Sequence, residues 1–319
     1  MDRNQVILGI DIGGTNTSSG LVDEIGNIFL VGSIATEAQE SFESFLERFN
    51  QDFDDRLKSS GQEFEIVAIG IGAPNANYYS GMIENPPNLS WGKVNLVEAF
   101  KRLYELPVVI TNDANAAALG EQKFGAAQGL SDFIEITLGT GLGSGLIVDG
   151  KLVLGSDGHA GELGHITVIP GGRLCTCGRR GCLETYVSAN GIKRTVVEMS
   201  EQGDTNSVLT NVPNDELSAE IITSAAEQGD MLSQNAFHQT ADILGLALAN
   251  IVAYLSPQVI ILFGGLAQAG DLLFKPLRSS FEKNLLRNYV GKVAIKPSGL
   301  KPGEAAILGA AALAWKETS

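Results

Sequence analysis

Apolar and polar residues follow one another along the chain in blocks that predict alternating strands and helices. Short apolar runs bounded by glycine, proline or asparagine predict strands, and apolar residues spaced three or four apart predict helices. The predicted strands occupy residues 5–10, 18–22, 27–34, 65–71, 107–111, 258–263 and a stretch near 292–296. The predicted helices occupy residues 41–58, 95–104, 114–124, 230–254, 270–286 and 304–316. This order is typical of an α/β fold.

The opening of the chain is repeated further along. When the sequence is shifted by 126 residues, residues 10–13 (IDIG) lie over residues 136–139 (ITLG). Both copies predict a strand, a glycine-rich turn, a strand, a tight turn and a strand, followed by helix–strand–helix material. The repeat predicts two duplicated α/β lobes, a smaller one over 1–125 and a larger one over 126–319. The closing helix, 304–319, is free to pack back on the first lobe.

Two long segments interrupt this pattern. Residues 72–92 form a loop rich in Asn, Pro and Gly, and loops of this length are usually functional or disordered. Trp91 and two tyrosines indicate an ordered loop. An insertion at about 155–215 interrupts the second lobe, and its part 203–216 is polar and rich in turn residues.

Composition and charge narrow the class of protein. Glycine supplies 38 of 319 residues, above the usual ~7 %, and it lies in short clusters at strand ends rather than in a linker. The formal net charge of −15 disfavours binding to nucleic-acid phosphates. No apolar run approaches the ~20 residues of a membrane span, the start lacks a signal-peptide pattern, and three cysteines argue against a disulfide framework. We therefore expect a cytosolic enzyme.

The first glycine cluster, residues 11–17 (DIGGTNT), lies between two predicted strands. It is neither a Walker P-loop nor a dinucleotide fingerprint, because both of those join a strand to a helix. Its backbone N–H groups can face an anion, and Asp11 can hold a metal ion through water. The alternative is a β-turn that only requires the conformational freedom of glycine.

Two further glycine clusters follow. Residues 138–145 (LGTGLGSG) stand at the repeated hairpin position, and a facing pair of such hairpins would hold a polyphosphate from both sides. Phe263-Gly264-Gly265 ends a strand and opens a helix, which is where an α/β fold places ligands. An ordinary strand–helix turn is the alternative for this third cluster.

Asn112 and Asp113 directly follow the predicted strand 107–111 and begin a helix. Asn and Asp are favoured at helix N-termini, so capping is one interpretation. In a phosphotransferase, a carboxylate at this place suits a general base, which accepts the proton of a substrate hydroxyl as its oxygen attacks the γ-phosphorus. Asn112 would then bind neighbouring sugar or polyol hydroxyls.

The three cysteines lie within eight residues, and His165 precedes the first of them by ten. Cys175, Cys177, Cys182 and His165 can satisfy a tetrahedral zinc ion with no open position, which predicts a structural site. His159 is a competing fourth ligand. Reduced buried thiols, or one disulfide with a leftover thiol, are the alternatives.

Two glutamates lie close to these ligands in the sequence. Glu162 precedes His165 by three residues, and Glu184 follows Cys182 by two. A zinc knuckle would hold both carboxylates rigidly, whereas an ordinary surface position is the alternative because glutamates are mostly exposed.

Four segments carry a resemblance to a known family: DIGGTNT at 11–17, NDANAAALGE at 112–121, LGTGLGSGLIVDGKLVLGSDGHAGELGH at 138–165 and CTCGRRGCLE at 175–184. They resemble the ROK family of sugar kinases (repressor, open reading frame, kinase) and fit the wider actin/Hsp70/hexokinase ATPase superfamily. The likeness runs from about residue 5 to 313. It implies two ribonuclease H-like lobes in an actin-like ATPase fold, an inserted zinc knuckle at 165–182, and a homodimer.

The resemblance also implies a role for individual residues. The catalytic base falls on Asp113. The sugar contacts fall on Asn112, Asp113, Glu162, His165 and Glu184, and His165 would give one ring nitrogen to zinc and the other to the sugar. The zinc ligands fall on His165, Cys175, Cys177 and Cys182. ATP phosphates fall on Gly13, Gly14, Thr15, Thr140 and Gly141, with Mg²⁺ near Asp11 and adenosine near Gly264 and Gly265.

The substrate is less closely defined. Many family members have a Pro-Gly pair after the strand 65–71, where this chain has Pro74-Asn75. The stretch 87–91 (PNLSW) resembles an element of glucose-type members and makes Asn88 a further sugar contact. We therefore expect a glucokinase, with kinases for mannose, fructose, N-acetylmannosamine or N-acetylglucosamine as alternatives.

Two non-enzymatic alternatives belong to other functional classes. Sugar-sensing repressors of the family carry an N-terminal helix-turn-helix, whereas here the first phosphate strand begins at about residue 5, so we expect no such domain. A non-catalytic sugar-binding regulator is disfavoured because Asp11, Asp113 and both glycine hairpins are present.

Overall fold

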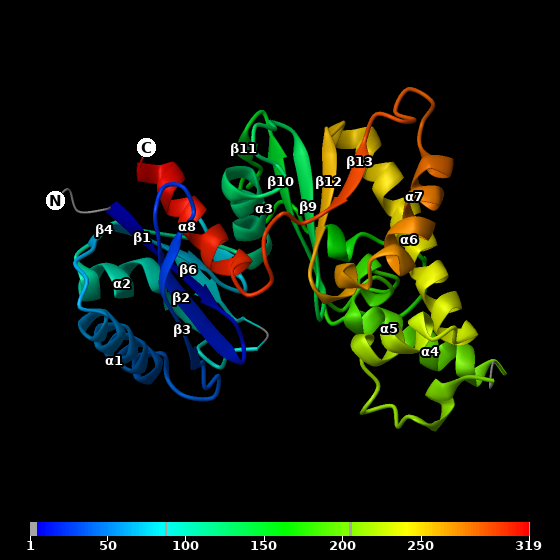
Figure 1. Cartoon of the computed structure of the whole chain (residues 1–319), viewed down its shortest axis with the longest axis horizontal. Coiled ribbons are helices and arrows are strands. Elements are labelled where there is room, and N and C mark those ends of the chain that lie inside the picture. Colours follow the sequence, from blue (N-terminus) through cyan, green and yellow to red (C-terminus); the bar gives the residue numbers. More distant parts are fainter. Residues whose placement is uncertain (1–4, 87, 204–205, 319) are drawn as a thin grey trace. The chain divides into compact units, whose positions relative to one another are not determined.

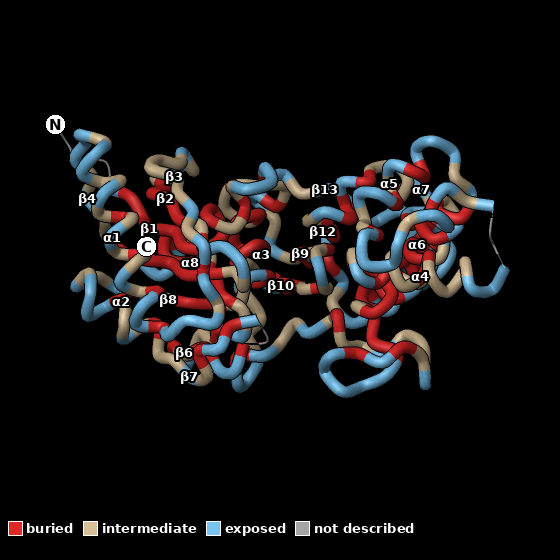
Figure 2. The backbone as a smooth tube through the Cα atoms, turned by 90° about the horizontal axis from the view of Figure 1, so that it is seen from below, coloured by how far each residue is buried: buried red, intermediate tan, exposed pale blue. Residues whose placement is uncertain are grey.

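The structure, a computed structural model, describes residues 5–86, 88–203 and 206–318 (Figure 1). The chain divides into two compact units. Unit 1 comprises Met1–Gly129, Leu152–Ala160 and Gly299–Ser319, and unit 2 comprises Leu130–Lys151 and Gly161–Ser298. Figure 2 shows that the buried residues concentrate in the strands and in the helices that cover them, so each unit has its own core.

Unit 1 is built on a five-stranded sheet in the order β3-β2-β1-β4-β8. The strands are β1 (Gln5–Ile12), β2 (Asn16–Val22), β3 (Ile28–Ala35), β4 (Glu65–Gly72) and β8 (Val108–Thr111). The first three strands form an antiparallel meander, and β4 and β8 extend it in parallel. The central strands are buried on both faces, which explains their nearly continuous apolar sequence.

Unit 2 repeats this plan with a sheet in the order β11-β10-β9-β12-β13. The strands are β9 (Phe133–Leu138), β10 (Leu142–Val148), β11 (Lys151–Leu152), β12 (Val259–Phe263) and β13 (Ala294–Pro297). The equivalent strand order confirms the predicted duplication. The turn of the first hairpin is residues 13–16, whereas that of the second is residues 139–141 and is one residue shorter.

Unit 1 contains α1 (Phe42–Ser60), α2 (Leu96–Tyr104), α3 (Asp113–Phe124) and α8 (Ala305–Thr318). The apolar face of α1 is a stripe of buried phenylalanines: Phe42, Phe45, Phe49 and Phe53. The helix begins where Ser41 accepts a hydrogen bond from Ser44 and ends at Gly61, whose φ of 62° favours glycine.

Helix α8 packs directly on β1, β4 and α3. A side chain at Gly70 of β4 would overlap with the backbone carbonyl of Ala310, and one at Gly309 would overlap with the carbonyl of Ala116. An added Cβ at Gly120 of α3 would lie 3.0 Å from the Cα of Gly309. These glycines let the backbones of the three elements approach each other, so the C-terminal helix forms part of the core of unit 1.

The buried carboxylate of Glu121, in the last turn of α3, joins two distant segments of unit 1. It accepts hydrogen bonds from the backbone N–H groups of Ala126 (2.6 Å) and Gly299 (3.2 Å). These residues lie close to the points where the chain leaves unit 1 and returns to it. A carboxylate that accepts several backbone N–H groups is stabilised despite its burial.

Unit 2 contains α4 (Ala189–Glu201), α5 (Ala219–Glu227), α6 (Met231–Leu255) and α7 (Asp271–Asn284). Contrary to the expectation from sequence, α6 is long and apolar enough to span a membrane by length and composition alone. However, 61 % of its most apolar window is buried within the protein, as in the core helix of a globular domain. Apart from Phe237, its buried apolar residues are small or medium-sized, and the helix packs against α4, α5 and α7.

The structure adds elements that the sequence pattern does not predict. The loop 72–92 and the residues after it contain a small antiparallel sheet of β5 (Ala76–Asn77), β6 (Met82–Glu84) and β7 (Lys93–Asn95). Trp91 packs its ring 4.8 Å from that of Phe45, in agreement with an ordered loop. Helices α4 and α5 were not expected, because threonine, serine and alanine dilute their apolar spacing.

Candidate functional site

The carboxyl end of the unit 1 sheet brings two aspartates together. Asp11 of β1 is paired with Gly72 of β4, which in turn is paired with Thr111 of β8. A Cβ added at Gly72 would lie 3.7 Å from Oδ1 of Asp11 and 4.0 Å from the Cα of Asp113. The two acidic residues therefore flank one glycine, although about a hundred residues separate them in the sequence. The absence of a side chain at Gly72 leaves space between them.

The surroundings of both carboxyls raise their pKa values. Burial, and then the negative charge of Asp113, raise the pKa of Asp11 to about 7. Asp113 keeps contact with solvent, but the protein atoms around its carboxyl desolvate it and raise its pKa, and the N–H of Ala114 opposes this shift. A carboxylate with a raised pKa is a better proton acceptor, and a cation beside Asp11 would relieve the repulsion between the two charges.

Asn112 is the N-cap of α3. Its Oδ1 accepts a hydrogen bond of 2.7 Å from the backbone N–H of Asn115. The capping interpretation is therefore realised, but it uses only the oxygen of the amide. The Nδ2 group remains a donor suited to a substrate hydroxyl, so capping and substrate binding are compatible.

The first glycine turn is closed by its own backbone. The N–H of Gly13 donates to the carbonyl of Asn16 (3.0 Å), and Thr36 binds the turn through its hydroxyl to Gly13 and its N–H to Thr15. Because the amide of Gly13 is used inside the turn, the groups left to face a phosphate are the exposed Thr15 and the neighbouring amides.

Gly14 of this turn has a second reason to be glycine. A Cβ added there would lie 2.7 Å from the Cβ of Asn88, so only glycine lets the 72–92 loop approach the turn this closely. Asn88 is exposed. Pro87, the first residue of the PNLSW stretch, lies outside the described residues. The structure thus brings a predicted sugar contact against a predicted phosphate turn.

The second glycine turn, in unit 2, is closed in the same way. The N–H of Gly139 donates to the carbonyl of Gly141 (3.0 Å), and Thr140 is exposed at the tip. A side chain at Gly141 would overlap with the carboxylate of Glu184, whose Oε2 accepts a hydrogen bond of 3.2 Å from the N–H of Leu142. One predicted sugar contact therefore touches one predicted phosphate turn.

The third glycine cluster lies beside the second. Phe263 at the end of β12 is paired with Thr137 of β9. Gly264 has a φ of 98°, and a Cβ there would lie 2.5 Å from the carbonyl oxygen of Leu138. A side chain at Gly265 would meet no atom within 4 Å. Gly264 is thus required for packing, and Gly265 leaves open space at the carboxyl end of the sheet.

The predicted zinc ligands converge. The candidate ligand atoms of His165, Cys175, Cys177 and Cys182 all lie within 4.8 Å of one another. The Nδ1 of His165 is 3.6 Å from the Sγ of Cys175, and the Sγ atoms of Cys177 and Cys182 are 3.7 Å apart. Tetrahedral ligands at about 2.0–2.3 Å from zinc stand roughly 3.5–3.8 Å apart. The set therefore fits a structural zinc ion, and His159 is not part of it.

The cysteines are free thiols, so the disulfide alternative is not realised. Desolvation raises the pKa of Cys175, and it raises the pKa of Cys182 to about 12. A backbone hydrogen bond from Arg179 lowers the pKa of Cys177. Closely spaced thiols resist joint ionisation, and a bound cation supplies the charge that allows it.

Two glutamates flank this cluster. The Oε2 of Glu162 is 3.9 Å from the Nε2 of His165, so the imidazole turns one nitrogen to the cluster and the other to Glu162. Oε1 of Glu184 accepts a hydrogen bond from the thiol of Cys175 (3.5 Å). Both carboxylates therefore lie beside residues of the Cys₃His cluster.

A buried arginine, which the sequence pattern did not single out, anchors the knuckle. Arg173 forms an ion pair of 2.7 Å with Glu198 of α4 and stacks 4.3 Å above the ring of Tyr186. Its Nη1 also donates to the carbonyl of Thr185 (2.6 Å). Because its ion-pair partner lies 25 residues away, no local spacing indicates it. The one signal in the sequence is its position two residues before the first cysteine.

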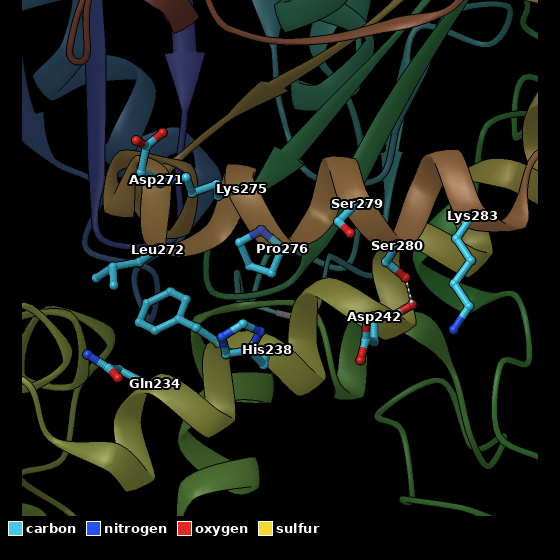
Figure 3. A pocket seen from close by; sticks show the side chains of 11 residues that line it. Gln234, His238, Asp242, Asp271, Leu272, Lys275, Pro276, Ser279, Ser280 and Lys283 are labelled. Carbon is cyan, nitrogen blue, oxygen red and sulfur yellow. Dashed lines mark hydrogen bonds between the residues drawn. The ribbon is translucent and has the colours of Figure 1, made fainter. Parts of the chain in front are cut away.

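A separate pocket of about 490 Å³ lies between α6 and α7 (Figure 3). Apolar Phe237, Leu272 and Pro276 line it together with charged groups of both signs, which include Asp242 and Lys275. None of the residues predicted to bind sugar, phosphate or metal lines this pocket. This pocket is therefore not the candidate site.

Known proteins of several kinds are similar to this chain. A family model described as "ROK family" matches residues 7–317. A glucokinase of Halalkalibacterium halodurans is 37 % identical over 279 residues, which cover 86 % of this chain and 84 % of that protein. A xylose repressor of Caldicellulosiruptor bescii is 31 % identical over 309 residues, 96 % of this chain and 77 % of the repressor. The crystal structure of a ROK family glucokinase from Streptomyces griseus in complex with glucose and AMPPNP has a TM-score of 0.82 at 35 % identity and covers 98 % of this chain and 99 % of that one.

Proposed function

Because the chain belongs to the ROK family, we propose that it is an ATP-dependent kinase that phosphorylates the 6-hydroxyl of a hexose, with glucose as the substrate. The observation that carries the proposal is the pair Asp11 and Asp113, two aspartates with raised pKa values at one sheet end. Similar proteins include a glucokinase and a glucokinase structure with glucose and AMPPNP.

In the proposed reaction, Asp113 is the general base. Its carboxylate accepts the proton of the hexose 6-hydroxyl while the oxygen attacks the γ-phosphorus of ATP. The bond between that phosphorus and the β,γ-bridging oxygen breaks, and ADP leaves with hexose 6-phosphate. Asp11 would hold Mg²⁺ through water, and the bound ion would supply positive charge to neutralise the phosphates. The raised pKa of Asp113 suits this role because it makes the carboxylate a stronger base toward the proton of the hexose hydroxyl.

The phosphates are bound mainly by neutral groups. We assign them to Gly13, Gly14, Thr15, Thr140 and Gly141, and adenosine to Gly264 and Gly265. In both hairpins the first glycine amide closes the turn, which leaves the exposed threonine at the tip as the donor. Backbone and hydroxyl donors let a chain of net charge −15 bind a polyanion without a basic patch.

The sugar hydroxyls are assigned to Asn88, Asn112, Glu162, His165 and Glu184 in addition to Asp113. Carboxylate, amide and imidazole groups are suited to pairs of neighbouring hydroxyls. Structural zinc at His165, Cys175, Cys177 and Cys182 would hold the backbone that carries Glu162 and Glu184, because these residues lie three positions before His165 and two positions after Cys182. The preference for glucose rests on the PNLSW stretch and on the glucokinases among the relatives.

A non-catalytic sugar-binding regulator is the second candidate, because xylose repressors are similar to this chain. The two functions differ in one measurement. ADP release would be assayed with glucose, mannose, fructose, N-acetylmannosamine and N-acetylglucosamine, with and without Mg²⁺. We expect glucose-dependent and Mg²⁺-dependent ADP release. Sugar binding without ADP release would favour the regulator, and faster release with another hexose would correct the substrate.

A further inference from the structure

Residues 152–160, which we call the strap, have an unusual place in the chain. The strap belongs to unit 1, although the residues before it (Leu130–Lys151) and after it (Gly161–Ser298) belong to unit 2. It begins at Leu152, the last residue of β11, and leads, without a further helix or strand, into Gly161 and Glu162. Glu162, a proposed sugar ligand of unit 2, thus closely follows a segment that belongs to unit 1.

A turn in the 72–92 loop holds the strap. The Nδ2 of Asn77 donates to the carbonyl of Asp157 (2.6 Å), and the hydroxyl of Tyr79 donates to the carbonyl of Gly155 (3.0 Å). Asn77 is itself fixed, because its Oδ1 accepts from the N–H groups of Tyr79 and Ser80.

The strap is shaped to fit this turn. Gly158 is buried at a φ of 86°, and a Cβ there would lie 2.6 Å from the Nδ2 of Asn77. The N–H of Ala160 donates to the carbonyl of Leu154 (3.1 Å), which closes the strap into a loop. Gly158 and the hydrogen bond between Ala160 and Leu154 both indicate that the strap has a defined conformation complementary to the Asn77 turn.

The residues that follow the strap are fixed within unit 2. The hydroxyl of Ser144 donates to the carbonyl of Gly161 and accepts from the N–H of Leu163 (3.4 Å). Ser144 therefore fixes the backbone on either side of Glu162. The strap ends at Ala160, directly before the first of these fixed residues, Gly161.

We propose that Asn77 and Tyr79 are positioning residues for the hexose site, which they influence through the strap. The proposal rests on the proposed function. The loop that carries this pair also carries Asn88, so a hydrogen-bonded and covalent path joins two assigned sugar ligands, Asn88 and Glu162. Loss of either hydrogen bond would loosen the approach to Glu162, and would leave the phosphate turns unchanged because neither turn contacts the strap through a hydrogen bond within the described part of the chain.

The neighbouring tyrosine provides a matched control. The hydroxyl of Tyr78 donates to Glu317 of α8 (2.7 Å) rather than to the strap. Tyr78→Phe and Tyr79→Phe therefore remove the same atom from adjacent residues, and only the second removes a strap contact. Asn77→Asp removes the Nδ2 donor and keeps the Oδ1 acceptor for the turn. Thermal melting of each variant establishes that it is folded.

The readouts are the KM values for hexose and for ATP in the ADP-release assay, and the hexose Kd by calorimetry without nucleotide. We expect Tyr79→Phe and Asn77→Asp to raise the hexose KM and Kd by about two- to tenfold, the effect of one lost hydrogen bond. The KM for ATP should stay within twofold, and Tyr78→Phe should leave both within twofold.

Two results would overturn the proposal. One is an unchanged hexose KM in both strap variants of an active enzyme, and the other is an equal rise in Tyr78→Phe. A wild-type protein that releases no ADP with any hexose contradicts the proposed function instead. In that case the calorimetric Kd of the variants still decides whether the strap positions a sugar site.

Discussion

The two units share a strand order but not the chemistry at the ends of their strands. Where unit 1 has Asp11, the internal repeat places Thr137 in unit 2, and the acidic pair Asp11 and Asp113 belongs to unit 1 alone. Unit 2 instead carries the Cys₃His cluster and the two glutamates beside it. The two units thus share one scaffold, but their distinguishing residues lie at the carboxyl end of the sheet in unit 1 and in the segment after β11 in unit 2. We assign proton transfer to unit 1 and the rigid placement of carboxylates to unit 2.

The largest effect, on kcat, is expected from substitution of Asp113, which belongs to the acidic pair of unit 1. Asp113→Asn keeps the size of the side chain but cannot accept the hydroxyl proton, so we expect kcat to fall by about 10²–10⁴-fold. The hexose Kd should change little, because an amide still binds hydroxyls. The measurement is a coupled ADP assay together with calorimetry of hexose binding. An unchanged kcat would remove the proposed base.

Loss of zinc should affect unit 2 and its carboxylates. We expect Cys177→Ser, or treatment with a chelator, to lower the melting temperature by several degrees or more and to raise the hexose KM, because Glu162 and Glu184 lie within three residues of zinc ligands in the chain. Thr176→Ser, between two ligands, is the control. Metal content by elemental analysis should fall from one zinc per chain to less than one. Full activity and an unchanged melting temperature after zinc removal would contradict the structural role.

Loss of Arg173, which anchors the knuckle, should destabilise the protein less than loss of the zinc ion. Arg173→Met removes a buried guanidinium that binds Glu198 and Thr185, and we expect a loss of about 2–4 kcal/mol in the free energy of unfolding. Arg180→Met is the control, because the Arg180 side chain is exposed and donates a single hydrogen bond of 3.3 Å, to the carbonyl of Gly172, within the described residues. Urea unfolding curves give both values. Equal effects of the two substitutions would show that the anchor is not specific.

The smallest effect, and the one with a defined pH dependence, concerns Asp11. Its pKa rises from 3.8 to about 7 on folding, so the folded state favours the protonated form. The wild type should therefore lose stability, relative to Asp11→Asn, as the pH rises from about 4 to 7, by about 1–3 kcal/mol. Urea unfolding at pH 4.5 and pH 8 without Mg²⁺ measures this difference. Asp215→Asn, at an exposed position, is the control, and a pH-independent difference would contradict the assignment.

Much of the fold could be predicted because its signals are local. The apolar strands and the two glycine turns stand out in the sequence, and the Cys₃His spacing identified the ligands that converge. The strands β5–β7 were not predicted because they are two or three residues long. Arg173, Glu121 and the Asn77 turn were missed for another reason. Their partners lie 25, 178 and 80 residues away, so only the folded chain reveals them.

The packing of the C-terminal helix α8 on glycines of β4 and α3 determines which unit can complete its fold first as the chain is synthesised. Helix α8 lies on Gly70 and against α3, and it fills the core of unit 1. A ribosome therefore has to release nearly the whole chain before the first unit can close, whereas most of unit 2 is made as one stretch, Gly161–Ser298. The domain that is begun first is completed last, and during elongation its open sheet is the surface on which a chaperone or a protease would act.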